Sequence, residues 1–253
     1  MIELNTERLA GIQVLHAAPA GQRDAALPTA LPTVLLYHGF TSSKEVYAYL
    51  AVALAQAGFR AVMPDADLHG ARDNGNDAVR LARFWQILQR NIDEMPQLEN
   101  ALRAAGLIDG DRFGVAGASL GGMTALGAMA RYPHIRSVAC LMGSGYFMQL
   151  SRSLFPPLQV STSEEQAQFD RLMAPLAAYD PCEKLEALAN RPLLLWHGEA
   201  DDVVPFAETA RLVEALRASG KADNMTFLSE KAIGHKITPF ALRALTDFFK
   251  QHL

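Results

Sequence analysis

A serine stands in a glycine-rich segment near the middle of the sequence, Gly117-Ala118-Ser119-Leu120-Gly121-Gly122. An apolar run typical of a buried strand, Phe113 to Ala116, precedes this segment, and residues with helical spacing follow it. The pattern Gly-x-Ser-x-Gly between a strand and a helix is a turn that exposes the serine hydroxyl as a nucleophile. The helix N-terminus behind the serine favours negative charge. We therefore predict that Ser119 is a catalytic nucleophile.

A serine hydroxyl needs a general base, and seven histidines compete for that role. His235 is the best candidate because it follows Gly234, comes after the last predicted strand and precedes the final helix. His69, in a loop after a strand, is the main rival. A packing or loop-bracing role is expected for His38 and His197, since each precedes a glycine at a strand end. The other three are interpreted as surface or loop residues: His16, His134 and His252.

The base needs an acid to orient it, and that acid is expected between the serine and the histidine in the chain. Asp201 and Asp202 both lie in the loop that follows the run Leu193 to Trp196. We choose Asp201, but one member of the pair could instead cap the segment that follows, which is a common role of aspartate in loops. Position alone leaves the choice between the two carboxylates open.

Two backbone amides are expected to stabilise the oxyanion of a tetrahedral intermediate. One is the amide of Leu120, directly after the nucleophile and at a helix N-terminus. The other should come from the loop His38-Gly39-Phe40-Thr41, which follows the strand ending at Tyr37. Phe40 is the best candidate in that loop.

The elements that must position these residues alternate between short apolar runs and longer segments with helical spacing. This alternation predicts an α/β fold with a mostly parallel, doubly wound sheet flanked by helices, and a site at the carboxyl ends of the strands. The first 16 residues suggest an antiparallel edge. The predicted strands are 34–37, 61–63, 113–116, 138–142, 193–196 and 225–228, and the predicted helices are 44–57, 77–105, 120–131, 206–218 and 238 to the C-terminus.

One stretch, at about residues 143–179, interrupts the alternation without a strand signal. We interpret it as a partly helical lid inserted over the site, although an ordinary crossover with a long helix would also fit. Its apolar side chains could line a substrate pocket or simply pack the lid. The candidate pocket residues are Tyr146, Phe147, Leu154 and Phe155.

The composition indicates one globular domain over residues 1–253, with half of the residues hydrophobic and a formal net charge of −4. Without a basic stripe, nucleic acid and anionic membranes are unexpected partners. Residues 1–10 lack a basic segment followed by an apolar one, so no secretory signal is predicted and a cytoplasmic location is expected. The two cysteines, Cys140 and Cys182, suggest reduced thiols rather than a disulfide or a metal site. A monomer or weak homodimer is expected.

With these residues assembled, the chain resembles the α/β-hydrolase superfamily over nearly its whole length, and within it the esterase and dienelactone-hydrolase-like branch. The segments that carry the resemblance are 37–43, 51–58, 142–147 and 153–158. It implies hydrolysis of short-chain carboxylic esters without a metal or organic cofactor. It also implies that Ser119, Asp201 and His235 match the family's triad. A serine nucleophile departs from the dienelactone hydrolases proper, which use cysteine.

The function expected from these residues is that of a serine carboxylesterase acting on a small ester. The same triad also serves thioester and amide cleavage, so an acyl thioesterase and a small peptidase are the enzymatic alternatives. A ligand-binding module of the same fold is the non-enzymatic alternative.

Overall fold

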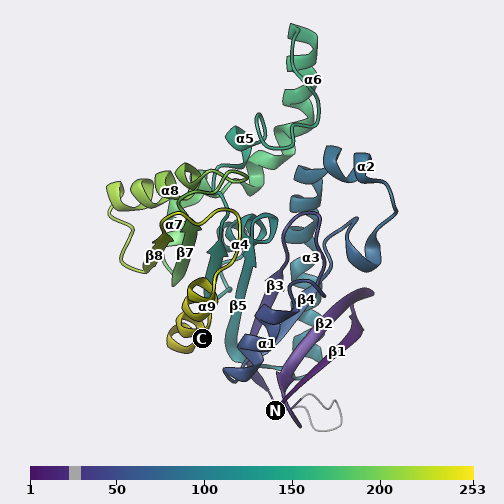
Figure 1. Ribbon diagram of the computed structural model, residues 1–253, viewed down its shortest axis with the longest axis vertical. Coiled ribbons are helices and arrows are strands. Elements are labelled where there is room, and N and C mark those ends of the chain that lie inside the picture. The colour runs from purple at the N-terminus through teal and green to yellow at the C-terminus, as the bar shows by residue number, and fades with distance from the viewer. Residues whose placement is uncertain (23–29) are drawn as a thin grey trace.

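Eight strands form one sheet in the computed structural model, which describes residues 1–22 and 30–253 (Figure 1). The strands are β1 (Ile2–Leu9), β2 (Ile12–Pro19), β3 (Leu31–Tyr37), β4 (Arg60–Pro64), β5 (Ile108–Ala118), β6 (Ser137–Leu141), β7 (Leu193–Gly198) and β8 (Met225–Glu230). Their order across the sheet is β1-β2-β4-β3-β5-β6-β7-β8. The pairs β1–β2 and β2–β4 are antiparallel, and the neighbouring pairs from β4 to β8 are parallel. This arrangement confirms the predicted α/β sheet.

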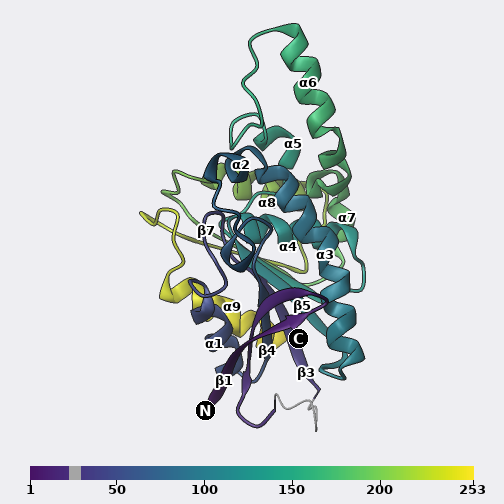
Figure 2. The ribbon, with the colours of Figure 1, turned by 90° about the vertical axis from the view of Figure 1, so that its right-hand side faces the viewer.

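Helices cover both faces of the sheet (Figure 2). The helices are α1 (Ala48–Gln56), α2 (Asp77–Ala82), α3 (Phe84–Ala104), α4 (Leu120–Arg131), α5 (Phe147–Leu150), α6 (Ser163–Met173), α7 (Leu185–Ala189), α8 (Phe206–Ala218) and α9 (Pro239–His252). Short 3₁₀ helices occupy Gly70–Arg72, Ala174–Tyr179 and Pro181–Lys184. Helices α1 and α9 lie on one face, and α3 and α4 lie on the other (Figure 2).

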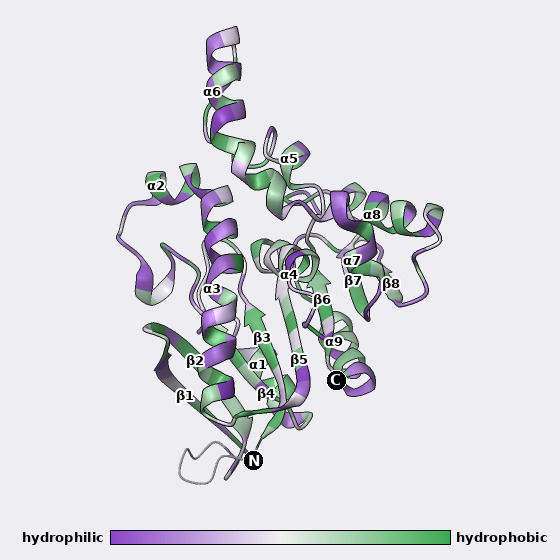
Figure 3. Ribbon diagram, turned by 180° about the vertical axis from the view of Figure 1, so that it is seen from behind, coloured by the Kyte–Doolittle hydropathy of each residue, from purple (hydrophilic) through white to green (hydrophobic). Residues whose placement is uncertain are grey.

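The alternation of side chains along β3 shows how the sequence builds the two layers. Val34 and Leu36 are buried in one apolar cluster with residues of α1 and α9, whereas Leu35 and Tyr37 are buried in another with residues of α3 and α4. Successive side chains of a strand point to opposite faces, so a continuous apolar run is needed where both faces are covered. Figure 3 shows much of β3 in the green of hydrophobic residues. Each such buried leucine or valine contributes about 1.5–3 kcal/mol.

Two helices differ from the sequence expectation at their boundaries. The helix predicted over 77–105 is interrupted at Arg83, because α2 buries no side chain whereas the first turn of α3 directs Phe84 and Trp85 into the core. The helix predicted from residue 44 begins at Ala48, because the backbone N–H and the side chain of Lys44 are both bound to a carboxylate elsewhere.

The segment 143–179 lies between β6 and β7 and contains α5, α6 and the 3₁₀ helix Ala174–Tyr179. Figure 1 shows α6 projecting beyond the end of the sheet to which the strands β3 and β5 point. The buried carboxylate of Asp180 accepts hydrogen bonds from the N–H groups of Phe147 and Met148, at 3.0 and 2.9 Å. One side chain thus joins the beginning of this segment to the residue that follows it.

No helix in the described parts of the chain has the length and apolar content that a membrane span requires.

Candidate active site

Ser119 occupies the single residue between the end of β5 and the beginning of α4. Its backbone has φ 57° and ψ −118°, a sparsely populated conformation that costs about 1–3 kcal/mol for a residue with a side chain. Close packing forces this turn: a Cβ added to Gly117 would lie 2.3 Å from the Gly121 carbonyl, and a Cβ on Gly121 would lie 2.0 Å from the oxygen of Tyr37. The serine is therefore held in a strained turn at the carboxyl end of a central strand.

Asp201 and His235 come together from two loops at the same edge of the sheet, after β7 and β8 respectively. Asp201 Oδ2 lies 2.7 Å from His235 Nδ1, and Asp201 Oδ1 accepts the backbone N–H groups of Val203 and Val204 at 2.9 Å each. Burial alone would raise the pKa of the Asp201 carboxyl, but hydrogen bonds from His197 and His235 outweigh burial and hold the pKa well below its usual range. Asp201 is therefore an anion positioned to orient the His235 ring, whereas Asp202 is exposed.

A third residue, His197, also contacts the Asp201 carboxylate. The fully buried ring of His197 brings Nε2 to 3.2 Å from Asp201 Oδ2 and 2.9 Å from the carbonyl oxygen of Val204. Its Nδ1 lies 2.7 Å from Thr209 Oγ1, and the Thr209 hydroxyl donates to the carbonyl of Gly143 at 3.0 Å. The bracing role predicted for a histidine at this strand end agrees with these contacts.

The His235 ring meets Asp201 through Nδ1, which leaves Nε2 as the nitrogen that could serve Ser119. Among the hydrogen bonds of residues 1–22 and 30–253, none joins Ser119 Oγ to this ring. Catalytic hydrogen bonds are often long in a ligand-free enzyme and tighten when substrate binds. The structure thus joins Asp201 to His235 and brings Ser119 to the same edge of the sheet.

The two expected oxyanion donors come from the residue after the serine and from a loop that packs against the serine turn. Leu120 is the first residue of α4, where backbone N–H groups have no partner within the helix. The loop that carries Phe40 packs against the turn, because a Cβ on Gly39 would lie 3.6 Å from the oxygen of Ala118 and a Cβ on Gly121 would lie 2.9 Å from the oxygen of His38. The Leu120 amide is therefore next to the serine in the chain, and the loop that carries Phe40 packs against the serine turn.

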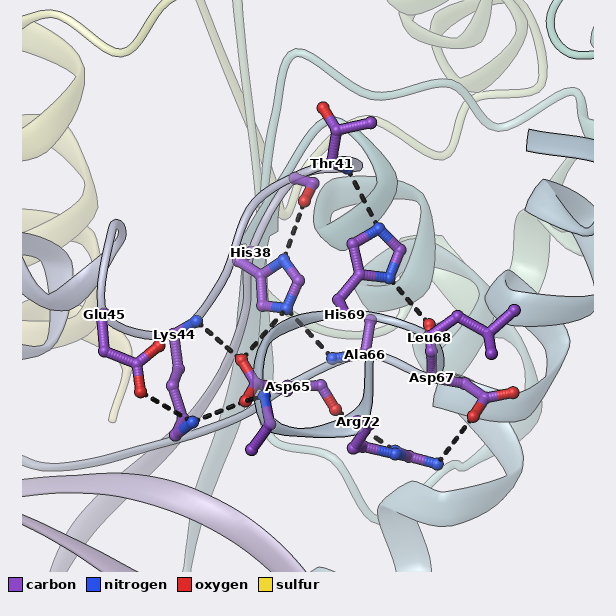
Figure 4. A network of polar contacts seen from close by, with 12 residues as sticks. His38, Thr41, Lys44, Glu45, Asp65, Ala66, Asp67, Leu68, His69 and Arg72 are labelled. Carbon is purple, nitrogen blue, oxygen red and sulfur yellow. Dashed lines mark hydrogen bonds and ion pairs between the residues drawn. The ribbon is translucent and has the colours of Figure 1, made fainter. Parts of the chain in front are cut away.

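A buried polar network supports the Phe40 loop from below (Figure 4). Its centre is Asp65, whose carboxylate accepts the backbone N–H of Lys44 at 2.9 Å and its ammonium group at 2.5 Å, with both side chains at most 1% exposed. The rings of His38 and His69 stand above it. Neither Lys44 nor Asp65 was predicted to belong to the site, because a pair 21 residues apart gives no sequence signal of burial.

His69 was the rival candidate for the general base, and the structure places it in this network. Its Nε2 accepts the backbone N–H of Thr41 at 3.0 Å, and its Nδ1 lies 2.7 Å from the carbonyl of Asp67. Burial lowers the pKa of the His69 ring, so the neutral form is favoured. Both ring nitrogens are thus engaged with the backbone.

Three of the four candidate pocket residues share one apolar cluster with Phe40 and Leu120. They are Phe147, Leu154 and Phe155. The Phe155 ring lies 4.9 Å, between centroids, from the rings of both Phe40 and Phe84. Phe84 is a neighbour of these rings that was not predicted from the sequence.

Tyr146, the fourth candidate, lies elsewhere. Its ring packs against the cluster between the sheet and α8, the Arg211 guanidinium carbon is 3.6 Å from its centroid, and its hydroxyl donates to the Arg211 carbonyl at 3.3 Å. These contacts place Tyr146 apart from the aromatic rings beside Phe40.

Metal ligation needs at least three donors close together. Within the described residues, no group of three or more His, Cys, Asp or Glu side chains is arranged to hold a metal ion.

Comparison with known proteins agrees with this geometry. Residues 46–253 match the prolyl oligopeptidase family. The chain is 51% identical to the esterase YjfP of Escherichia coli and 35% identical to YitV of Bacillus subtilis, in both cases over 100% of each chain. Among solved structures, TT1662 from Thermus thermophilus is similar with a TM-score of 0.75 and 27% identity, over 98% of each chain. The chain therefore belongs to the prolyl oligopeptidase family, and it is a hydrolase with the α/β-hydrolase fold.

Proposed function

We propose that the protein is a serine carboxylesterase that hydrolyses short-chain carboxylic esters through an acyl-enzyme on Ser119. The observation that carries the proposal is the 2.7 Å contact between Asp201 Oδ2 and His235 Nδ1, at the sheet edge where Ser119 is held in its strained turn. A nucleophile, an acid and a base, in this order along the chain, are the groups that serve acyl transfer in this fold.

In the first half of the reaction, His235 Nε2 takes the proton of the Ser119 hydroxyl while Oγ attacks the ester carbonyl carbon. The carbonyl oxygen becomes an oxyanion that accepts the N–H groups of Phe40 and Leu120, each donor lowering the barrier by about 3 kcal/mol. The C–O bond to the alcohol then breaks, and the protonated His235 gives its proton to the leaving alkoxide. Asp201 stabilises the imidazolium throughout this step.

In the second half, His235 takes a proton from water as the water oxygen attacks the acyl-enzyme. The second oxyanion uses the same two amides, and its collapse breaks the bond to Ser119 Oγ, which regains the proton from His235. The acid product leaves, and the chain's own groups complete the cycle.

One observation supports the ester bond as the target, and another supports a small acyl group. The relative that is 51% identical is named an esterase. Beside the expected oxyanion position, the rings of Phe40, Phe84 and Phe155 pack against one another with centroids 4.9 Å apart, which restricts the space for a long chain.

The experiment is hydrolysis of p-nitrophenyl esters from acetate to palmitate by the wild type, Ser119→Ala and the matched control Ser219→Ala, which changes an exposed serine at the end of α8. Turnover that peaks at short acyl chains, disappears in Ser119→Ala and persists in Ser219→Ala supports the proposal. Turnover that survives in Ser119→Ala would overturn it.

Amide hydrolysis is a second candidate, because the matching family is named for peptidases. The same triad cleaves both bonds. The amine of an amide is a poorer leaving group than the alcohol of an ester, so the general acid must protonate its nitrogen before the C–N bond breaks. Comparing a p-nitrophenyl ester with the p-nitroanilide of the same acid separates the two functions. A kcat/KM for the anilide that equals or exceeds that for the ester would favour a peptidase.

A further inference from the structure

The two peptide groups on either side of Phe40 are each bound by the ring of a buried histidine (Figure 4). His38 Nδ1 lies 2.7 Å from the carbonyl oxygen of Gly39, and His69 Nε2 lies 3.0 Å from the backbone nitrogen of Thr41. The first contact holds the peptide that joins Gly39 to Phe40. The second holds the peptide that joins Phe40 to Thr41.

The partners determine the tautomer of each ring. A backbone N–H can only donate, so His38 Nε2, which lies 3.0 Å from the Ala66 nitrogen, must be the acceptor and Nδ1 must carry the proton. The same argument assigns the proton of His69 to Nδ1, which donates to the carbonyl of Asp67 at 2.7 Å. Both rings are therefore neutral, and each has one donor and one acceptor in a defined direction.

The carbonyl of Gly39 and the N–H of Phe40 belong to the same planar peptide, so the contact of His38 with the carbonyl also fixes the direction of the N–H. In a trans peptide, the carbonyl and the N–H point in opposite directions. By donating to the carbonyl of Gly39, His38 turns the N–H of Phe40 away from its own ring. The Gly39 backbone packs beside Ala118, so this N–H is on the loop that faces the serine turn.

The loop does not adopt this shape from intrinsic preference. Thr41, a β-branched residue, has φ 58°, a conformation that costs about 1–3 kcal/mol and persists where surrounding contacts impose it. The Thr41 N–H is the group that His69 binds. The contact with His69 is therefore one of those that hold Thr41 in its strained conformation.

We propose that His38 and His69 are positioning residues that aim the Phe40 amide at the oxyanion. They act through the backbone and touch no substrate. The inference rests on the proposed function, because it assigns the Phe40 amide to the oxyanion of acyl transfer.

The rings of His38 and His69 are held by the same short segment of backbone, which fixes their separation. His38 binds the N–H of Ala66 and His69 binds the carbonyl of Asp67, so both stand on the short segment that follows β4. Asp65 anchors this segment through its contacts with Lys44 and with the N–H of Ala71 at 2.8 Å. A Cβ on Gly70 would lie 2.3 Å from the Asp65 carboxyl carbon, so the carboxylate occupies the space that a side chain at position 70 would fill.

The test uses asparagine and glutamine, because their amides reproduce different nitrogens of a histidine ring. An Asn amide reaches the position of Nδ1, and a Gln amide reaches that of Nε2. His38→Asn therefore keeps the donor to Gly39 and loses the acceptor for Ala66, and His38→Gln does the reverse. His69→Gln keeps the acceptor for Thr41, and His69→Asn loses it.

The proposal predicts a crossed order of activity: at position 38 the asparagine variant should be more active than the glutamine variant, and at position 69 the glutamine variant should be more active than the asparagine variant. His38→Gln and His69→Asn should lower kcat by about 10²-fold with KM nearly unchanged, as expected when an oxyanion donor is misaligned. His38→Asn and His69→Gln should retain most of the activity. The thermal midpoint of each variant is measured alongside, and His252→Gln, at the end of α9, is the control.

The rate at which a fluorophosphonate labels Ser119 provides a second readout that requires no ester substrate. The same crossed order in labelling, without ester turnover by the wild type, would contradict the proposed function and still support this inference. Ester turnover by the wild type with the same residue preferred at both positions, or with losses that follow only the thermal midpoints, would overturn the inference.

Discussion

His197 Nε2 lies 3.2 Å from Asp201 Oδ2, the same carboxylate oxygen that contacts His235 Nδ1 at 2.7 Å. One carboxylate thus serves a fully buried ring and a partly exposed ring. The buried ring is fixed by Val204 and Thr209, so it holds the carboxylate in place. Orientation of the His235 ring consequently depends on contacts that lie below the surface of the site.

The Asp201 carboxylate is expected to be essential, and its neighbour is a matched control. Asp201→Asn preserves the shape of the side chain but removes the charge that orients His235, so kcat should fall by about 10³–10⁴-fold. Asp202→Asn changes an exposed side chain in the same loop and should leave kcat within about threefold of the wild type, since surface changes have small effects. Ester turnover measured on both variants checks this. An equal loss of kcat in the two variants would contradict the assignment of Asp201 as the acid.

The aromatic rings beside Phe40 are expected to limit the length of the acyl chain. Phe155→Ala removes the ring that packs 4.9 Å from both Phe40 and Phe84, and the space should admit longer esters. The ratio of kcat/KM for octanoate to that for acetate should rise about tenfold, within the range that a few methylene groups provide in an apolar pocket.

Tyr146→Ala is the control for this change, because Tyr146 packs against Arg211 rather than against these rings. Its acyl preference should match that of the wild type. An unchanged preference in Phe155→Ala, or an equal shift in both variants, would show that the rings do not set the limit.

Gly121 should tolerate no side chain, because its Cβ would lie 2.0 Å from the backbone oxygen of Tyr37. Gly121→Ala should lower the free energy of unfolding by more than about 3 kcal/mol, since backbone atoms of a central strand must move. Gly145→Ala is the comparison: its Cβ would meet only the flexible side chain of Leu212, at 2.9 Å or more. Urea unfolding of the two variants measures the difference, and equal stabilities would contradict the close packing of the turn.

The buried histidines of the Phe40 loop should make stability depend on pH. Burial lowers the pKa of His38 from 6.5 to about 4 and also lowers that of His69. In the unfolded chain these rings bind protons below pH 6.5, whereas in the folded protein His38 stays neutral to about pH 4. The stabilisation is therefore complete above pH 6.5 and is lost as the pH falls toward 4, by about 3 kcal/mol for His38.

The charged groups that face His38 are Asp65, Lys44 and His69, and those that face His69 are Arg80, Asp73 and Asp65. Urea midpoints between pH 7 and pH 4.5 check the prediction, and His38→Asn should flatten the dependence. Asp201 adds little to the change in stability between pH 7 and pH 4.5. Its pKa is lowered from the usual 3.8 in the folded protein, so the stability that it contributes is lost only at still lower pH. Parallel pH curves for the wild type and His38→Asn would contradict the assignment.

The sheet could be predicted from the sequence because local patterns determine it. Each apolar run, such as Val34 to Tyr37, is long enough to fill both faces of a strand, and the glycines around Ser119 mark the turn unambiguously. The order of serine, acid and histidine along the chain follows from the same topology. Asp201 and Asp202 are adjacent, however, and the sequence could not decide which of them turns toward His235.

The support of the site could not be predicted, because it depends on contacts between distant segments. Lys44 and Asp65 both look like ordinary surface charges in the sequence, and each is buried only because the other is present. The break between α2 and α3 likewise arises because Phe84 and Trp85 have a core to enter. Tertiary contacts of this kind override local propensity.

The carboxylate of Asp180, which binds the N–H groups of Phe147 and Met148, has a consequence for how this fold can diversify. Because Asp180 closes the segment at its base and helix α6 is packed through Phe169 and Met173, only the exposed stretch at residues 159–164 is free of such contacts. That stretch can change in length with little penalty, about 0.6 kcal/mol for each doubling of a flexible loop. Insertions there should leave the sheet unaltered while the outer end of the segment varies.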